Sequence, residues 1–183
     1  MKQTLLLSGT LMLGVTTTGV LNARADVQLD SLLADNMVLQ REKPIPVWGT
    51  AKPGERVTVR VSQQKQSAVT DADGTWKVML NPLPIAQKVP FEVRGTNRID
   101  LHNVAVGDVF ICSGQSNMEF NVSGVNNAAR EIAAADFPNV RLLTVPRAVK
   151  GTRQTSFVSP VQWDVCSPQT VPIFSAVGYF FGR

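Results

Sequence analysis

One short run of small and polar residues is the segment best suited to chemistry, Cys112-Ser113-Gly114-Gln115-Ser116-Asn117-Met118. The apolar run Val109 to Cys112, which leads into it, is typical of a strand that is buried on both faces. Open α/β sheets carry their active sites at the carboxyl ends of such strands. There Ser116 can present its hydroxyl as a nucleophile, and its own N–H, near a helix start, can donate to an oxyanion. The segment therefore predicts acyl transfer through a serine.

The neighbours of Ser116 are expected to shape this loop. Gly114 allows a tight turn and leaves space for a substrate, while Gln115 and Asn117 are polar residues suited to support the loop or contact the substrate. The run is not a Gly-x-Ser-x-Gly elbow, because Met118 stands where the second glycine would be. The residues alone leave open a nucleophile loop and an ordinary loop that contains a serine.

The elements around this loop predict the opening of an α/β domain from residue 107 onward. A strand over 109–112 is followed by a predicted helix over 126–135, a strand over 140–145 and a helix over 173–183. A strand–helix–strand–helix order is typical of a parallel sheet. Two strands do not complete such a sheet, so the domain is expected to be truncated at Arg183, with an unfinished edge that favours aggregation.

Residues 26–106 have a different pattern, that of short alternating strands separated by turn residues. Val57, Val59 and Val61 alternate strictly, and Asp71-Ala72-Asp73-Gly74 is a hairpin signal. We interpret the two aspartates as a turn rather than a calcium site, since no twelve-residue loop with a closing Glu follows. Seven or eight strands at this spacing predict an antiparallel β-sandwich, of an immunoglobulin-like or galactose-binding-like kind. Trp48 and Trp76 are either buried sandwich residues or platforms for a sugar ring.

The first 25 residues are predicted to be a cleaved signal peptide. A positive start is followed by an apolar run and by Ala23-Arg24-Ala25, the small-x-small pattern of a cleavage site. The run is short for a membrane span, although an N-terminal anchor is the alternative. Removing Lys2 and Arg24 with this segment reduces the formal net charge from +4 to +2. The protein is expected to be exported to the periplasm or the cell exterior, without a membrane span after cleavage.

The composition narrows the partners and the redox chemistry. The basic residues are scattered among apolar ones rather than clustered in a stripe, so we do not expect nucleic acid binding. The two cysteines, Cys112 and Cys166, form either one disulfide in an oxidising compartment or two free thiols. No cysteine precedes Cys112, which excludes a lipid-anchored lipoprotein.

Several stretches resemble one known family, the sialate O-acetylesterases of the SGNH (GDSL-like) hydrolase superfamily. The resemblance is carried by Val104-Ala105-Val106-Gly107-Asp108-Val109, the run from Cys112 to Glu119, the run from Leu33 to Arg41, Pro46-Val47-Trp48-Gly49, the run from Thr70 to Trp76, Trp163 with Cys166-Ser167-Pro168, and the run from Phe174 to Phe181. It covers nearly all of residues 26–183. It implies hydrolysis of O-acetyl groups on sugars, sialic acid among them, with Ser116 as the nucleophile and without a metal or organic cofactor.

The chain departs from the family pattern in the groups that should assist Ser116. The resemblance implies a catalytic His and Asp and an oxyanion Gly and Asn from later blocks, none of which matches a residue of this chain. The one histidine, His102, is predicted to be a surface residue of a strand. Asp108 is expected to be structural, and Glu119 is expected to anchor the loop. Because a serine without its base is a poor nucleophile, we expect the chain alone to be nearly inactive.

A different class of function fits the same residues. The protein can be an exported carbohydrate O-acetylesterase represented by its N-terminal part, or a non-catalytic carbohydrate-binding or interaction module in which the sandwich binds and the remainder is inert. A continuation of the reading frame with an Asp-x-x-His block would decide for the esterase.

Overall fold

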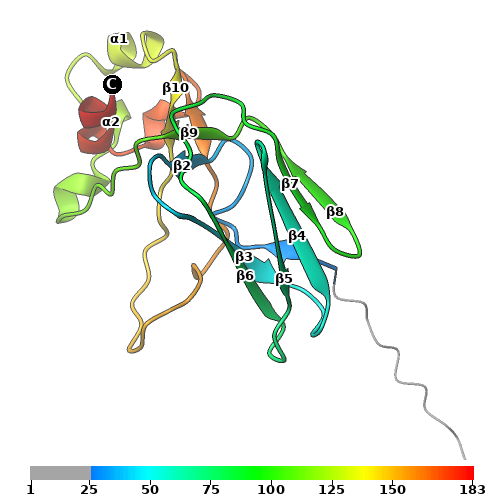
Figure 1. The fold of residues 1–183 in the computed structure, drawn as a ribbon. Helices are drawn as coiled ribbons and strands as arrows, with labels where there is room; N and C mark the ends of the chain where they lie inside the picture. Colours follow the sequence, from blue (N-terminus) through cyan, green and yellow to red (C-terminus); the bar gives the residue numbers. More distant parts are fainter. Residues whose placement is uncertain (1–25) are drawn as a thin grey trace, which may run out of the picture.

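Two antiparallel sheets make up most of the N-terminal part of the protein. The computed structural model describes residues 26–183 (Figure 1), so the predicted signal peptide lies outside the described residues. The first sheet has the order β1-β3-β6 and the second β5-β4-β7-β8. Their strands are β1 (Gln28–Leu29), β3 (Ile45–Thr50), β4 (Arg56–Val61), β5 (Gln64–Val69), β6 (Thr75–Leu80), β7 (Phe91–Arg94) and β8 (Arg98–Leu101).

The alternation of apolar residues places both sheets against one core. Val57, Val59 and Val61 of β4 are fully buried, and they share a core with Trp76 of β6 and Phe91 of β7. Residues of a strand alternate between its two faces, so the intervening positions of β4 and β6 are left at the surface or half-buried. The predicted alternating strands are confirmed, and the buried position of Trp76 removes it as a platform for a sugar ring.

The hairpin predicted at Asp71-Ala72-Asp73-Gly74 is confirmed. Gly74 has a φ of +84°, which glycine adopts without a steric penalty, and its N–H donates to the Asp71 carbonyl at 3.0 Å. Asp73 Oδ1 accepts from both the N–H and the hydroxyl of Thr75, at 2.9 and 2.8 Å. These hydrogen bonds assign Asp73 to the turn.

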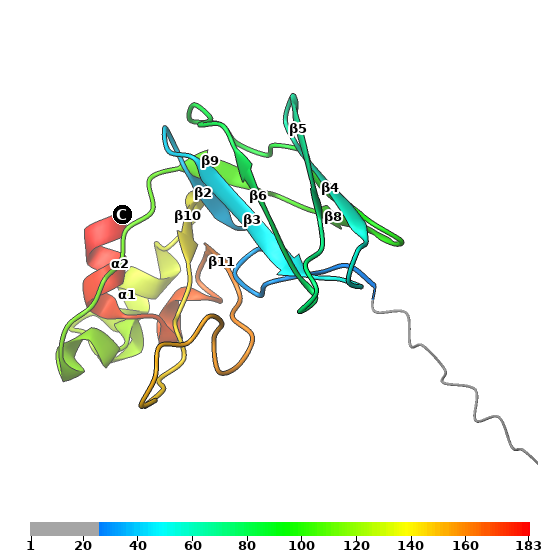
Figure 2. The ribbon, with the colours of Figure 1, turned by 60° about the horizontal axis from the view of Figure 1, so that its bottom comes forward.

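A short parallel pair connects the sheets to the remainder of the chain. β2 (Val38–Gln40) pairs with β9 (Ala105–Gly107), with Leu39 opposite Val106. Beyond β9 the chain leaves the two sheets, and the helices gather at the other side of the molecule, next to β2 and β9 (Figures 1 and 2).

The C-terminal part packs around a second, smaller core. Its elements are the 3-10 helices η1 (Ser116–Glu119), η2 (Val122–Gly124) and η3 (Val171–Ile173), the helices α1 (Ala128–Ala133) and α2 (Ala176–Gly182), and the strands β10 (Phe137–Leu142) and β11 (Asp164–Cys166). Val122, Leu142, Cys166, Val171 and Tyr179 are buried together. The helices predicted over 126–135 and 173–183 are confirmed with narrower bounds, and the predicted strand over 140–145 starts earlier, at Phe137.

The parallel sheet predicted from residue 107 onward is not present in the described residues. The pair that does form there, β10 with β11, is antiparallel. Val109 to Cys112, predicted as a strand buried on both faces, is exposed and pairs with no strand of residues 26–183, and Ile111 is 93% exposed. Such a strand is buried only when neighbours cover both of its faces, and residues 26–183 supply no such neighbours.

Candidate active site

Ser116 lies at the first position of η1, immediately after the exposed run 109–115. Gln115 precedes it in an extended conformation, and the Gln115 carbonyl accepts from the Met118 N–H at 2.9 Å, which closes the turn. Within residues 26–183, neither the hydroxyl nor the N–H of Ser116 makes a hydrogen bond. Ser116 therefore has an exposed hydroxyl and a free backbone donor at a helix start, and its role as a nucleophile stays a prediction.

The residues around Ser116 differ in what they contribute. A Cβ on Gly114 would lie 2.9 Å from Met118 Cγ, so glycine permits a close approach of this side chain. The side chains of Gln115 and Asn117 are exposed and make no hydrogen bond within residues 26–183, whereas the Asn117 carbonyl accepts from the Phe120 N–H at 3.3 Å. Their predicted contact with a substrate stays a prediction.

The segment after Ser116 is held by the start of α2. The Phe120 carbonyl accepts from the Ala176 N–H at 2.8 Å, and the Val122 N–H donates to the Phe174 carbonyl at 3.1 Å. The hydroxyl of Ser175 accepts from the Gly178 N–H and caps α2. The C-terminal side of η1 is thus fixed to an element about sixty residues further along the chain.

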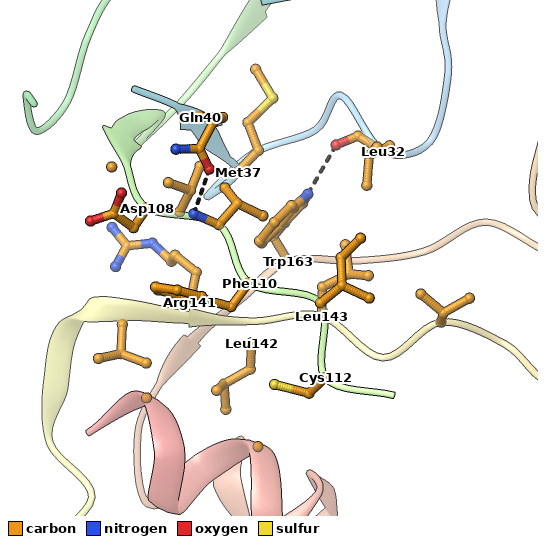
Figure 3. Close-up of a pocket in the computed structure, with 18 of the residues that line it drawn as sticks. Leu32, Met37, Gln40, Asp108, Phe110, Cys112, Arg141, Leu142, Leu143 and Trp163 are labelled. Atoms are coloured by element: carbon orange, nitrogen blue, oxygen red, sulfur yellow. Dashed lines mark hydrogen bonds between the residues drawn. The ribbon is translucent and has the colours of Figure 1, made fainter. Parts of the chain in front are cut away.

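The start of the segment that leads to Ser116 is held by the end of β2 and the residue that follows it. Gln40 Oε1 accepts from the Val109 N–H at 2.9 Å (Figure 3), and the Arg41 N–H donates to the Gly107 carbonyl at 2.9 Å. Arg41 Nε also pairs with Asp108 at 2.9 Å. This hydrogen bond holds the pKa of the Asp108 carboxyl below its usual value. We call these contacts the 40–41 clamp; they give Asp108 the structural role expected from the sequence.

Glu119 is occupied by an ion pair. Its carboxylate lies 3.2 Å from the guanidinium of Arg147, in the loop after β10. The contact anchors η1 to that loop, in agreement with the anchoring role predicted for Glu119.

His102 lies among the sheets, just after β8, and its ring is at the surface. Its N–H donates to Asp35 Oδ1 at 2.7 Å, and its carbonyl accepts from the Asn36 N–H at 3.0 Å. No contact joins it to Ser116 within residues 26–183. The described residues thus bring no imidazole to the serine, and the expected surface position of His102 is confirmed.

A large cavity of about 1310 Å³ opens between the two parts of the molecule (Figure 3). Its lining includes Gln40, Phe110, Arg141 and Trp163, together with Met118 and Glu119 of η1. Ser116 itself is not part of the lining, so the cavity adjoins η1 without including the Ser116 hydroxyl. The wall is largely apolar, because the exposed run 109–112 contributes to it.

Arg141 of β10 lines the cavity, and its buried guanidinium was not predicted from the sequence. It donates to the Pro138 carbonyl, and its Nε is buried without a partner among the described residues. Burial lowers the pKa of its guanidinium below the usual value. In the sequence, Arg141 stands within the apolar run Val140-Arg141-Leu142-Leu143, and this pattern indicated only a half-buried strand.

Both cysteines are free thiols in the structure, with Cys112 exposed beside the loop and Cys166 buried in the second core. Of the two alternatives left open by the sequence, the structure therefore has the free thiols. Desolvation raises the pKa of the Cys166 thiol.

Comparisons with known proteins first define a class. No family model matches the chain. A solved carbohydrate acetylesterase from Xanthomonas citri superposes with a TM-score of 0.81 at 33% identity, covering 85% of this chain and 36% of that one. The chain thus shares fold and sequence with a carbohydrate acetylesterase.

Curated relatives then define the family. Sialate O-acetylesterase of Homo sapiens is 32% identical over 174 residues, which are 84% of this chain and 33% of that protein. The Mus musculus protein of the same name is 38% identical over 130 residues, 63% of this chain and 24% of that protein. The chain is a homologue of the sialate O-acetylesterases, which confirms the resemblance found in its motifs, and it spans about a third of the length of the human relative.

Proposed function

We propose that this protein acts in the hydrolysis of O-acetyl groups on sugars, sialic acid among them, and that Ser116 is the nucleophile. One observation carries the proposal: in a homologue of carbohydrate esterases, Ser116 begins η1 with both its hydroxyl and its N–H unengaged within residues 26–183. Two separate sets of contacts, the 40–41 clamp and the start of α2, hold the loop in place.

In the proposed reaction, Ser116 Oγ attacks the acetyl carbonyl carbon while a base removes the hydroxyl proton. The carbonyl oxygen becomes an oxyanion, to which the Ser116 N–H donates. Collapse of this intermediate breaks the bond to the sugar oxygen, which takes up the proton, and leaves Ser116 acetylated. Water then attacks the acetyl group, and acetate leaves with regeneration of the serine.

We further propose that residues 26–183 alone catalyse this reaction slowly, because they bring no base to Ser116. A positioned acid–base group contributes about 10²–10⁴-fold in rate. His102 is engaged through its backbone among the sheets, and Glu119 is paired with Arg147. The base, its carboxylate partner and further oxyanion donors are expected from residues outside this chain.

The domain organisation follows the same proposal. Residues 26–106 form a β-sandwich module and residues 107–183 form part of an SGNH-like hydrolase domain. Two separate cores support this division: the first consists of residues up to Val106 together with Trp163, and the second consists of residues from Val122 onward. The exposed apolar run 109–112, at the edge of the large cavity, has the composition of a strand that further strands of such a domain would cover.

Export is also a proposal, based on the predicted signal peptide over residues 1–25. In the described residues, no helix is long and apolar enough to cross a membrane. Cell fractionation followed by N-terminal sequencing of the recovered chain tests this point, and a protein in the cytoplasm that retains Met1 would contradict it.

Chemical rescue tests the nucleophile and the missing base together. The chain is incubated with p-nitrophenyl acetate and with O-acetylated sialic acid over a range of imidazole concentrations, beside Ser116→Ala and the matched control Ser113→Ala. The expected result is a slow rate that imidazole raises in the wild type and in Ser113→Ala, above the background given by Ser116→Ala. Mass spectrometry is expected to find the acetyl group on Ser116.

Two outcomes contradict the proposal in different ways. Equal rates of the wild type and Ser116→Ala at every imidazole concentration, without acetylation of Ser116, would refute the assignment of the nucleophile. Fast Ser116-dependent turnover without imidazole would show that the chain supplies its own base, and His102→Ala would then be the next variant.

A further inference from the structure

The three tryptophans of the protein lie in different surroundings. Trp76 is 2% exposed in the core of the two sheets, and Trp163 Nε1 donates to the Leu32 carbonyl at 2.9 Å. Trp48 of β3 is half-buried, on the face of the strand opposite the buried Ile45 and Val47. Part of its side chain packs against the core of the two sheets. Its indole N–H donates to no group of residues 26–183, so Trp48 combines a half-buried ring with a free donor.

A small cavity of about 270 Å³ lies against this indole, and Ser116 is not part of its lining. Leu32, Trp48 and Phe157 line both this cavity and the large cavity that reaches η1. Trp48 lines it from β3, Asp30 and Leu32 line it from the turn after β1, and residues 154–157 line it from the loop after β10. The Asp30 N–H donates to the Trp48 carbonyl at 3.3 Å, which joins the backbones of two residues that line the cavity. Two segments more than a hundred residues apart in the chain thus form one concave site.

The polar groups of this site retain free hydrogen-bonding capacity. Asp30 Oδ1 accepts from the Leu32 N–H at 3.0 Å, while its Oδ2 has no partner within residues 26–183. Gln154 Nε2 donates to the Thr152 carbonyl at 2.9 Å, while its Oε1 has no partner in the same residues. The site therefore offers two acceptors and the indole N–H donor beside an aromatic face.

We propose that this cavity, the Trp48 site, binds one ring of a neutral sugar beside the large cavity, without a contact to Ser116. A sugar ring has an apolar C–H face that suits the indole, and hydroxyls around its edge that donate to Asp30 and Gln154. The volume lies just under the range of drug-sized sites, about 300–1,000 Å³, and so suits a single ring. The Asp30 carboxylate disfavours an acidic ring by charge repulsion.

This inference goes beyond the proposed function, because it does not use Ser116 and concerns a second sugar of a larger glycan. The site is small and makes few contacts with one ring of about twelve heavy atoms. We therefore expect weak binding, with a Kd of about 1 mM. A glycan that carries an acetylated residue could then be held by this second ring while the ester is cut elsewhere.

Ligand-observed NMR with the chain tests the proposal, with titration of methyl galactoside, methyl glucoside and methyl sialoside into the tens of millimolar range. Saturable binding of a neutral glycoside is expected in the wild type and in Ser116→Ala. It should weaken about tenfold or more in Trp48→Ala and in Gln154→Ala; the second change lies in an exposed loop and spares the core. Lys65→Ala, on the exposed strand β5, is the matched control and should bind as the wild type does.

Three results would overturn the Trp48 site: no saturable binding of either neutral glycoside, binding that survives both Trp48→Ala and Gln154→Ala, or binding of the sialoside alone. Loss of binding in Ser116→Ala would move the sugar to the nucleophile loop and would also overturn it. Failure of the imidazole rescue leaves this experiment unaffected, so the two proposals fail separately.

Discussion

Trp163 is the residue of the C-terminal part that enters the core of the two sheets. Its side chain is 9% exposed, it packs with that core, and its Nε1 donates to the Leu32 carbonyl at 2.9 Å. The Asn36 side chain also donates to the Trp163 carbonyl, at 3.3 Å. We predict that Trp163→Ala loosens the attachment of the part that bears Ser116 to the two sheets.

The expected cost follows from packing and from one lost hydrogen bond. Replacing a buried tryptophan by alanine costs about 3–5 kcal/mol, and Trp163, at the edge of the core, should fall near 3 kcal/mol. Trp163→Phe keeps most of the ring but leaves the Leu32 carbonyl without its donor, which costs about 1–2 kcal/mol. With a urea dependence of about 1–3 kcal/mol per molar for a small protein, Trp163→Ala should lower the urea midpoint by about 1–3 M.

Urea unfolding measured by far-UV circular dichroism checks these relative costs, together with hydrogen exchange of the paired strands β10 and β11. Ile173→Ala is the control, because Ile173 is 78% exposed and a surface change costs within about 0.5 kcal/mol. Exchange of the β10 and β11 amides should rise in Trp163→Ala and stay unchanged in Ile173→Ala. If Trp163→Ala shifts the midpoint no more than Ile173→Ala does, the reasoning that Trp163 joins the two parts is refuted.

Three further predictions concern single positions. Gly49→Ala should lower the free energy of unfolding by at least about 2 kcal/mol, because the new Cβ would lie 1.9 Å from a backbone oxygen of β1; Gly151→Ala, with open space around it, should melt like the wild type. Asp108 has a lowered pKa through its hydrogen bond with Arg41, so its stabilisation is full above the ordinary carboxyl pKa and is lost as the pH falls through the lowered value. Asp108→Asn should therefore unfold more easily than the wild type near neutral pH, and the two urea midpoints should converge in acid; a constant gap would contradict this. Cys112 should react with a thiol reagent in the native protein, while buried Cys166, whose pKa is raised by desolvation, should react only after unfolding; equal rates would contradict its burial.

Local pattern was sufficient to predict the elements whose burial depends on their own neighbours in the sequence. Val57, Val59 and Val61 alternate because β4 has one face against the core, and the turn at Asp71-Ala72-Asp73-Gly74 is set by its own side chains. The periodic apolar residues of the two C-terminal helices were likewise sufficient for their positions. In each case the information lies within about ten residues of chain.

Val109 to Cys112 shows where local pattern fails. Four consecutive apolar residues indicate a strand buried on both faces, but burial of such a strand is a property of the strands on either side of it. Residues 26–183 supply none, so the run is exposed and borders the large cavity. The antiparallel pairing of β10 with β11 was missed for a related reason, because β11 is a three-residue strand with no periodicity of its own.

The contacts that hold the segments before and after Ser116, the 40–41 clamp among them, could not be predicted from the sequence either. Each of these contacts joins residues that are far apart in the chain. Gln40 and Arg41 reach across sixty-seven to sixty-nine positions to Asp108 and Val109, and Phe120 meets the start of α2 at Ala176. Held from both sides, the loop keeps the Ser116 hydroxyl and N–H free within residues 26–183. For Ser116 as the proposed nucleophile and oxyanion donor, a loop fixed in advance lowers the entropic and reorganisation costs of the proposed reaction. The 40–41 clamp positions the start of the segment that leads to Ser116. Beyond the described residues, the proposed reaction needs a base, its carboxylate partner and further oxyanion donors.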